Sequence, residues 1–175
     1  MLTTFPRLML DHATARPDAA ALREKSYGIW QTTTWAQLAT LVRQLACGLA
    51  EAGLRRDDHV VVVSDNRPRL YATMLAVQSL GGVPIPLYQD AASTEFVFPI
   101  NNADVGFAVV ENQEQVDKLL DIRAQCPKLG RIWFDDPRGL RKYDEPGLAA
   151  MDALVEAAPM RHTRSPGSAL PTLSA

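Results

Sequence analysis

The pattern of apolar and polar positions opens with an amphipathic helix near the amino terminus. Phe5, Leu8, Met9 and Ala13 recur at helical spacing, and Pro17 closes the segment. We therefore predict a short helix that packs on a larger body, and we expect its role to be structural.

Strand-forming residues dominate the next two stretches, residues 20–24 and 29–33. The triplet Ser26-Tyr27-Gly28 lies between them and favours a turn. Two such runs on either side of a glycine-containing turn predict an antiparallel β-hairpin.

The clearest helix in the sequence begins after this hairpin. Thr34 and Gln37 have the spacing of a capping box, in which the two side chains satisfy backbone N–H groups at the helix start. Gly53 tolerates the left-handed conformation that commonly ends a helix. Between them, apolar residues follow helical periodicity at Trp35, Leu38, Val42, Leu45, Ala46 and Leu49.

The remainder of the chain alternates between apolar runs and helical patterns. Val60 to Val63 is apolar on both faces, which is typical of a strand buried inside a parallel sheet. Further strands are predicted at residues 83–87, 105–110 and 131–134. Strands separated by helices indicate βαβ units, so we predict an α/β fold with a partial doubly wound, mostly parallel sheet and helices on both faces.

The helices between these strands are predicted from their caps and periodicity. One has Asn66 as its N-cap and Pro68 in its first turn. Another opens at Ser93 or Thr94, and Pro99 should kink or shorten it. A helix is also predicted over residues 113–125, and a short helical stretch over 149–158.

Organisation in the sequence ends near residue 158. Residues 159–175 contain no acidic residue and no apolar periodicity, and they mix Pro, Ser, Thr and Arg. Such a segment cannot bury enough surface to offset its ordering entropy. We therefore expect one domain over residues 1–158 and a disordered tail over 159–175.

Composition narrows the class of protein. The chain has 175 residues, is 47% hydrophobic and carries a net charge of −2, which is typical of a globular protein with a real core. Basic residues are scattered, so a nucleic-acid partner is not expected. The sequence contains no apolar run long enough for a transmembrane segment, and no signal-peptide pattern at its start, so we expect a cytoplasmic location.

Chemistry in such a sheet is expected beyond the carboxyl ends of the strands, in the loops after Val63, Leu87, Val110 and Phe134. The N–H groups of the segment from Ser64 to Arg67 could hold an anion there, although simple helix capping explains the segment equally well.

Other candidate residues point to structural roles. Asp57-Asp58 is better explained as a charged turn than as a paired acid site. No spacing brings the histidines, His12, His59 and His162, onto one metal ion. Cys47 and Cys126 lie outside any C-x-x-C motif, and we expect both thiols to be buried and unreactive.

Motifs for phosphate binding or nucleophilic catalysis are also missing. Gly48 and Gly53 have the glycine spacing of a Walker loop, but Leu54-Arg55 follows instead of Lys-Ser/Thr. The sequence contains neither Gly-x-Gly-x-x-Gly nor a Gly-x-Ser-x-Gly elbow. We therefore assign no catalytic, cofactor-binding or metal-binding residue.

The order of the motifs nevertheless resembles the beginning of the AMP-forming acyl-CoA synthetases, which are adenylate-forming enzymes. The resemblance runs from Phe5 to about Ala158. Its strongest part is the strand segment from Leu80 to Tyr88, with Glu95 at the opening of the next helix. The segment from Val109 to Leu119 is similar to the long-chain fatty acid branch.

This resemblance implies a reaction in which ATP, with Mg²⁺, converts a fatty acid to an acyl-adenylate and pyrophosphate. Coenzyme A then takes the acyl group. It also implies that the full-length enzyme associates peripherally with membranes. The family's phosphate loop ending in lysine should follow shortly after Ala158, but the segment from Pro159 to Ser168 lacks it.

We therefore hypothesise a truncated N-terminal subdomain of the adenylate-forming fold, inactive alone, with a tail that is out of frame. An exposed sheet edge should then promote self-association. Two alternatives remain: a stand-alone α/β binding or regulatory module without ligase activity, and an unrelated doubly wound protein.

Overall fold

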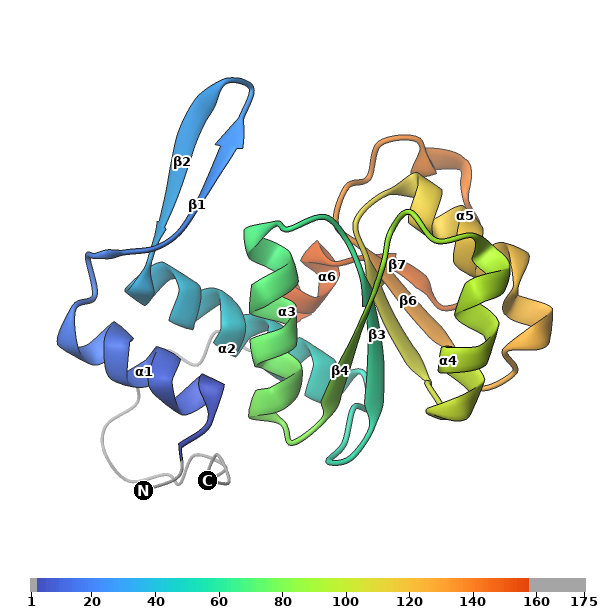
Figure 1. The fold of residues 1–175 in the computed structure, drawn as a ribbon, viewed down its shortest axis with the longest axis horizontal. Coiled ribbons are helices and arrows are strands. Elements are labelled where there is room, and N and C mark those ends of the chain that lie inside the picture. Colours follow the sequence, from blue (N-terminus) through green and yellow to red (C-terminus); the bar gives the residue numbers. More distant parts are fainter. Residues whose placement is uncertain (1–2, 158–175) are drawn as a thin grey trace.

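The computed structural model describes residues 3–157, and its centre is a five-stranded parallel sheet (Figure 1). The order of strands across the sheet is β4-β3-β5-β6-β7. Strands β4, β5 and β6 lie within segments where the sequence predicts a strand, and β3 begins one residue before its predicted segment, at His59. The bounds are β3 His59–Val63, β4 Val83–Leu87, β5 Phe107–Val110, β6 Arg131–Phe134 and β7 Leu148–Ala150.

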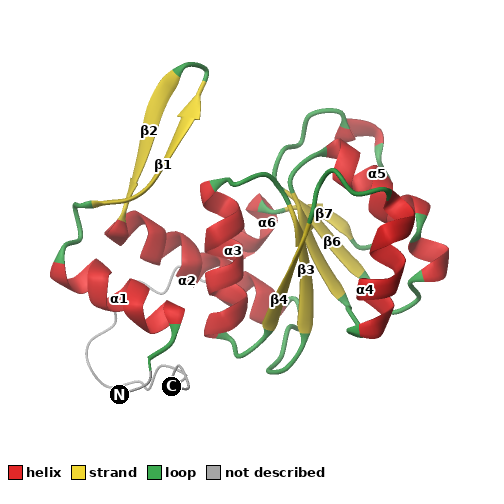
Figure 2. Ribbon diagram, in the orientation of Figure 1, coloured by secondary structure: helices red, strands yellow, loops and turns green. Residues whose placement is uncertain are grey.

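Helices cover both faces of this sheet (Figure 2), as the sequence predicts. One face carries α1 Phe5–Ala15, α2 Trp35–Glu51, α3 Pro68–Ser79 and α6 Asp152–Ala157. The other carries the 3₁₀ turn η1 Ser93–Phe96, α4 Val97–Asn102, α5 Gln113–Asp121 and the 3₁₀ turns η2 Arg123–Gln125 and η3 Leu140–Lys142.

The valine run in β3 explains why two cores form. Side chains alternate across a strand, so Val60 and Val62 enter the core beneath α2 and α3. Val61 and Val63 enter the core beneath α4 and α5. All four side chains are buried. Because a central parallel strand is covered on both faces, its sequence has no alternation of apolar and polar residues.

The predicted hairpin is formed by β1 Ala20–Ser26 and β2 Ile29–Thr34, which pair antiparallel. Tyr27 and Gly28 both have positive φ, 48° and 81°, as the central residues of a tight hairpin turn require. The hairpin is a separate two-stranded sheet that projects away from the body (Figure 1).

The caps of α2 agree with the prediction. Thr34 Oγ1 accepts from the N–H of Gln37 at 3.3 Å, and Gln37 Oε1 accepts from the N–H of Thr34 at 2.9 Å. Gly53 follows the helix with a φ of 107°, a left-handed conformation that favours glycine.

Strand β4 forms one edge of the five-stranded sheet, which explains its two prolines. Pro84 and Pro86 cannot donate backbone hydrogen bonds, so they are compatible with an edge position and would not suit a central strand. They also make this edge a poor template for another strand.

Three sequence predictions of local structure require correction. The stretch 149–158 is not one helix: residues 148–150 form β7, because Trp133 of β6 pairs with Ala149, and α6 begins at Asp152. The N-cap of α3 is Arg67 rather than Asn66, whose side chain accepts from Tyr71 Oη at 3.0 Å. The predicted helix over 113–125 ends at Asp121 and continues as η2.

One further predicted boundary is wrong, and one predicted helix break is confirmed. Strand β5 begins at Phe107, two residues after the predicted start of its apolar run. The expectation for Pro99 is confirmed, since the segment is divided into η1 and a six-residue α4 with Pro99 in its first turn. The predicted tail, residues 159–175, lies outside the described residues.

Candidate functional site

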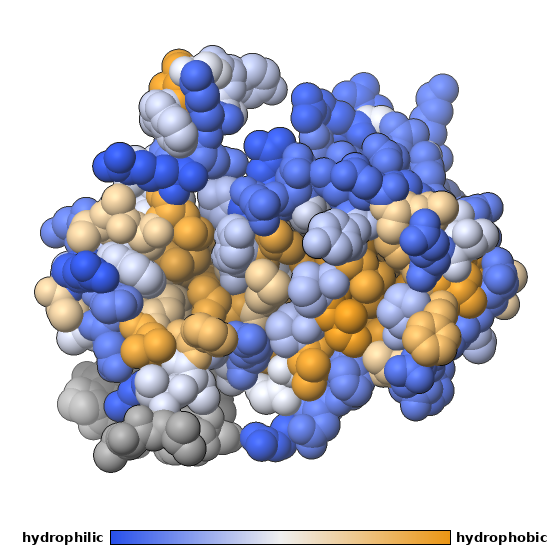
Figure 3. Space-filling model, viewed as in Figure 1, coloured by the Kyte–Doolittle hydropathy of each residue, from blue (hydrophilic) through white to orange (hydrophobic). Residues whose placement is uncertain are grey.

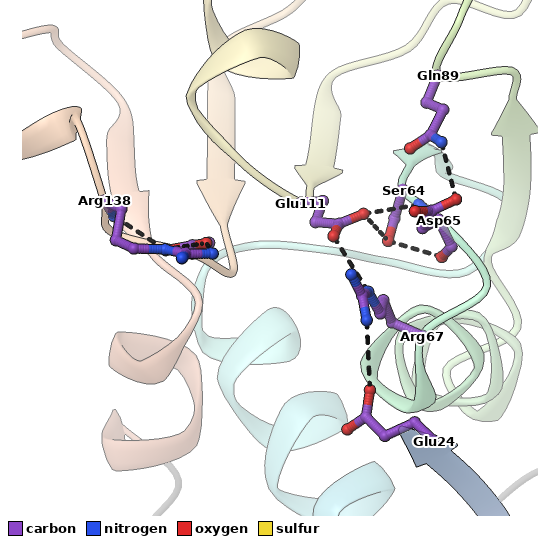
Figure 4. A network of polar contacts seen from close by, with 8 residues as sticks. Glu24, Ser64, Asp65, Arg67, Gln89, Glu111 and Arg138 are labelled. Atoms are coloured by element: carbon purple, nitrogen blue, oxygen red, sulfur yellow. Dashed lines mark hydrogen bonds and ion pairs between the residues drawn. The ribbon is translucent and has the colours of Figure 1, made fainter. Parts of the chain in front are cut away.

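Polar residues converge where the parallel strands end (Figure 4), at the edge where the sequence predicts chemistry. Ser64 and Asp65 follow β3, Gln89 follows β4 and Glu111 follows β5. Asp135 and Asp136 follow β6 in the same way. Figure 3 shows this edge as mostly hydrophilic, in contrast with the apolar surface lower on the same view.

Glu111 is the centre of this arrangement. Its carboxylate accepts from the N–H of Asp65 at 2.7 Å and from Ser64 Oγ at 3.2 Å. Arg67 Nε lies 3.2 Å from the other oxygen. The Glu111 side chain is 14% exposed, and these donors satisfy a carboxylate that would otherwise be costly to bury.

The sequence left open whether the N–H groups of residues 64–67 bind an anion or only cap a helix. The loop does hold an anion, but the anion is Glu111 of the same chain, 46 residues away from Asp65 in sequence. The sequence does not predict this role of Glu111, because nothing local to either segment indicates the contact. The only available signal was that a polar residue follows each strand.

The network extends in two directions from Glu111. Arg67 reaches the hairpin, where its Nη1 lies 3.9 Å from a carboxylate oxygen of Glu24. On the other side, Gln89 Nε2 donates to Asp65 at 2.8 Å, and Lys118 Nζ donates to the Gln89 carbonyl. The loops after β3 and β4 are thus tied to each other, to α5 and to the hairpin.

A second set of ion pairs lies after β6. Arg69 of α3 pairs with Asp135 at 2.9 Å and with Asp152 of α6 at 2.7 Å. Burial raises the pKa of the Asp135 carboxyl, and Arg69 opposes that rise without cancelling it. Asp136 receives hydrogen bonds from the Arg138 side chain and backbone, and these lower its pKa.

A groove of about 390 Å³ lies between the hairpin and this edge of the sheet. Its charged lining has both signs, and most of these charges are already paired with one another. The charged residues are Glu24, Lys25, Arg67, Arg69, Glu111, Asp135, Asp136 and Arg138.

The other sequence candidates lie away from this groove. Asp58 Oδ2 accepts from the N–H of Arg55 at 2.7 Å, so it serves the turn before β3, as predicted. His12 packs against Trp35 with ring centroids 4.6 Å apart. His162 lies outside the described residues.

The expectation for the cysteines is half right. Cys126 is buried, and burial raises the pKa of its thiol, which makes it less reactive. Cys47 is exposed rather than buried, because it lies on the outer side of α2, next to the buried Ala46 and Gly48. Among the residues that the structure describes, no group of His, Cys, Asp or Glu could hold a metal ion.

The fold defines the class as an open parallel α/β domain with its polar site at the carboxyl edge. The comparison with family models then identifies the family: the model described as AMP-binding enzyme matches residues 10–164. The chain belongs to the AMP-binding enzyme family and corresponds to an N-terminal portion of its fold.

Individual relatives agree with this family. The uncharacterised protein Rv1549 of Mycobacterium tuberculosis is 34% identical over 117 residues, which cover 67% of this chain and 65% of that protein. The long-chain-fatty-acid–CoA ligase FadD15 of Mycobacterium bovis is 22% identical over 153 residues, which cover 86% of this chain and 26% of the ligase.

Solved structures show the same fold. The coronafacic acid ligase of Pectobacterium brasiliense superposes with a TM-score of 0.78 at 19% identity, covering 88% of this chain and 29% of that one. The N-terminal domain of FACL13 from Mycobacterium tuberculosis gives a TM-score of 0.69 at 18% identity, covering 95% of this chain and 38% of that one. This chain spans 65% of the length of Rv1549 and 26% of the length of FadD15, so it corresponds to only part of each of these relatives.

The described residues do not fit the triphosphate of the ATP that the family implies. A triphosphate needs backbone N–H groups or cations that are not already engaged. Here Glu111 takes the N–H of Asp65 and the Arg67 side chain. Arg69 and Arg138 are paired with aspartates. Residues 3–157 also place several carboxylates at this edge, and these would repel phosphate.

No helix among the described residues is both long enough and apolar enough to cross a membrane.

Proposed function

We propose that this chain is the N-terminal part of a long-chain fatty acid–CoA ligase and that it has no ligase activity by itself. The complete reaction would convert ATP, a fatty acid and coenzyme A to acyl-CoA, AMP and pyrophosphate. Membership of the AMP-binding family and the similarity to fatty acid–CoA ligases support the assignment.

The main support for the proposed inactivity is the Glu111 carboxylate at the carboxyl edge of the sheet. Glu111 occupies the donors that an incoming phosphate would need. Catalysis of adenylation requires cations and N–H groups preorganised around the developing charge. In the groove, Arg67, Arg69 and Arg138 are each engaged by a carboxylate of the chain itself.

The direct test is release of pyrophosphate by the purified 175-residue chain, given ATP, Mg²⁺ and a long-chain fatty acid, with and without coenzyme A. We expect no release above a sample without protein. A full-length fatty acid–CoA ligase is the positive control. Release that depends on both ATP and the fatty acid would contradict the proposed inactivity.

Residues 159–175 belong to the same proposal: beyond the family match, which ends at residue 164, the reading frame of this tail differs from that of the parent ligase. Sequencing the coding DNA downstream of the Asp152 codon tests this. We expect another frame to encode a loop rich in Gly, Ser and Thr that ends in lysine. A verified stop without such a loop in any frame would favour the stand-alone module instead.

Complementation distinguishes the stand-alone module from a non-functional piece. If the chain works with a separately supplied remainder of the AMP-binding domain, mixing the two purified polypeptides should restore pyrophosphate release. Each purified polypeptide assayed alone is the matched control.

A further inference from the structure

The hairpin exposes the backbone edge of β2, which is suited to pairing with another strand. Within residues 3–157, strand β2 pairs with β1 on one side only, and this two-stranded sheet is separate from the five-stranded one. A hairpin of two strands is marginally stable alone and gains stability from a third strand. Its free end carries exposed apolar and aromatic side chains: Tyr27 is 94% exposed, Ile29 64% and Trp30 66%.

The edge of β2 lacks the usual protection against strand addition. Ile29–Thr34 contains no charged residue and no proline, and it is rich in residues that favour strands. The opposite edge belongs to β1, where Arg23, Glu24 and Lys25 are consecutive. The edge strand β4 of the large sheet contains Pro84 and Pro86, and β7 at the other edge has only three residues.

The register identifies the backbone groups that β2 offers. Ser26 pairs with Ile29 across the tight turn, Lys25 with Trp30, and Arg23 with Thr32. In such a hairpin the pair next to the turn exchanges both hydrogen bonds, and bonded and non-bonded pairs then alternate. Trp30 and Thr32 therefore direct their N–H and C=O groups away from β1, toward the free edge.

We infer that two copies of this chain associate through their β2 edges, forming a four-stranded antiparallel sheet in the order β1-β2-β2-β1. A two-fold axis brings the same strand from both copies together, so the strand must tolerate its own side chains. Because β2 is uncharged, no like charges meet across that axis. Pairing through β1 would instead bring Arg23 and Lys25 of the two copies together.

The position of the hairpin permits this contact. It extends beyond the helices and the large sheet (Figure 1), and hydrophobic colour appears at its free end (Figure 3). Two hairpins can therefore meet while the two bodies remain apart. This inference does not depend on the ligase assignment, because it uses only the exposure and composition of the hairpin.

The test measures the mass of the full chain in solution by light scattering and sedimentation over a wide concentration range. We expect a monomer–dimer equilibrium that Thr32→Pro shifts to monomer, because proline removes the N–H at the free edge of β2. Arg23→Pro is the matched control: it removes the corresponding N–H on β1 at the paired position and should leave the dimer intact.

Amide hydrogen exchange gives a second readout that needs no variant. The N–H groups of Trp30 and Thr32 should exchange more slowly as the protein concentration rises, while those of Arg23 and Lys25 should not change. A chain that is monomeric at every concentration, or a dimer that protects other segments and survives Thr32→Pro, would overturn the inference.

Discussion

Adjacent residues at the end of β6 show how strongly local surroundings determine the behaviour of a carboxyl group. Asp135 is largely buried and its pKa is raised, even though Arg69 lies 2.9 Å away. Asp136 is the next residue, and hydrogen bonds from Arg138 lower its pKa. Identical side chains therefore contribute to stability with opposite dependence on pH.

The two carboxyls can be separated by comparing Asp136→Asn with Asp135→Asn in thermal unfolding from pH ~3 to ~7, a range that spans ordinary carboxyl titration. Asp136 has a lowered pKa in the folded state, so its contribution is present at neutral pH and is lost as pH falls through that pKa. Asp136→Asn should therefore destabilise at neutral pH and have a smaller effect in acid.

Asp135→Asn should behave differently. The raised pKa means that ionisation of Asp135 disfavours the folded state above that pKa, and that stability is regained as pH falls through it. At neutral pH this variant should lose less stability than Asp136→Asn. Equal losses for both variants at every pH would contradict the assigned environments.

Packing between helices depends on one glycine in α2. A Cβ at Gly48 would lie 2.2 Å from the carbonyl oxygen of Leu154 in α6, which is backbone and cannot rotate away. Glycine thus permits α6 to lie directly on α2, and Leu154 completes the core on this side of the sheet. Its role is close packing, and the Walker-like spacing with Gly53 is incidental.

We expect Gly48→Ala to lower the free energy of unfolding by about 1–3 kcal/mol, the typical cost of overpacking. Denaturant unfolding followed by circular dichroism measures this change. Gly106→Ala is the control, because a Cβ there would lie 3.7 Å from its nearest neighbour, the Lys128 carbonyl oxygen, in ordinary contact. If Gly48→Ala is as stable as Gly106→Ala, α6 does not pack on α2 as described.

At the scale of the whole molecule, the hairpin and the body are nearly independent. The body holds both cores, and from β1 only Ala21 and Leu22 pack against one of them. The contact between Arg67 and Glu24 is a long, partly exposed ion pair, a kind that contributes little to stability. The hairpin should therefore matter for association more than for folding.

Shortening the hairpin tests this independence. Leu22 and Thr33 are paired across the two strands, so residues 23–32 can be replaced by an Asn-Gly turn. We expect a cooperative thermal transition close to that of the full chain, together with loss of the dimer. A shortened chain that fails to unfold cooperatively would show that the hairpin is part of the folding unit.

Elements whose signals are local can be predicted from the sequence alone. The capping box at Thr34, the valine run in β3 and the turn at Tyr27-Gly28 each specify their structure through neighbouring residues. The periodicity of apolar residues likewise predicts a parallel sheet covered on both faces, because the spacing of apolar residues along each strand reflects which of its faces are buried. The ordered succession of these elements was enough to suggest the family.

Features that depend on residues distant in sequence follow from the three-dimensional arrangement of the strands and cannot be predicted locally. Leu148–Ala150 has no strand signal of its own and becomes β7 because β6 offers it an edge. Glu111 meets Asp65 because two parallel strands end side by side, and that contact converts a loop able to bind an anion into one already filled. Side-chain pairing across a sheet follows from strand order, which no local pattern encodes.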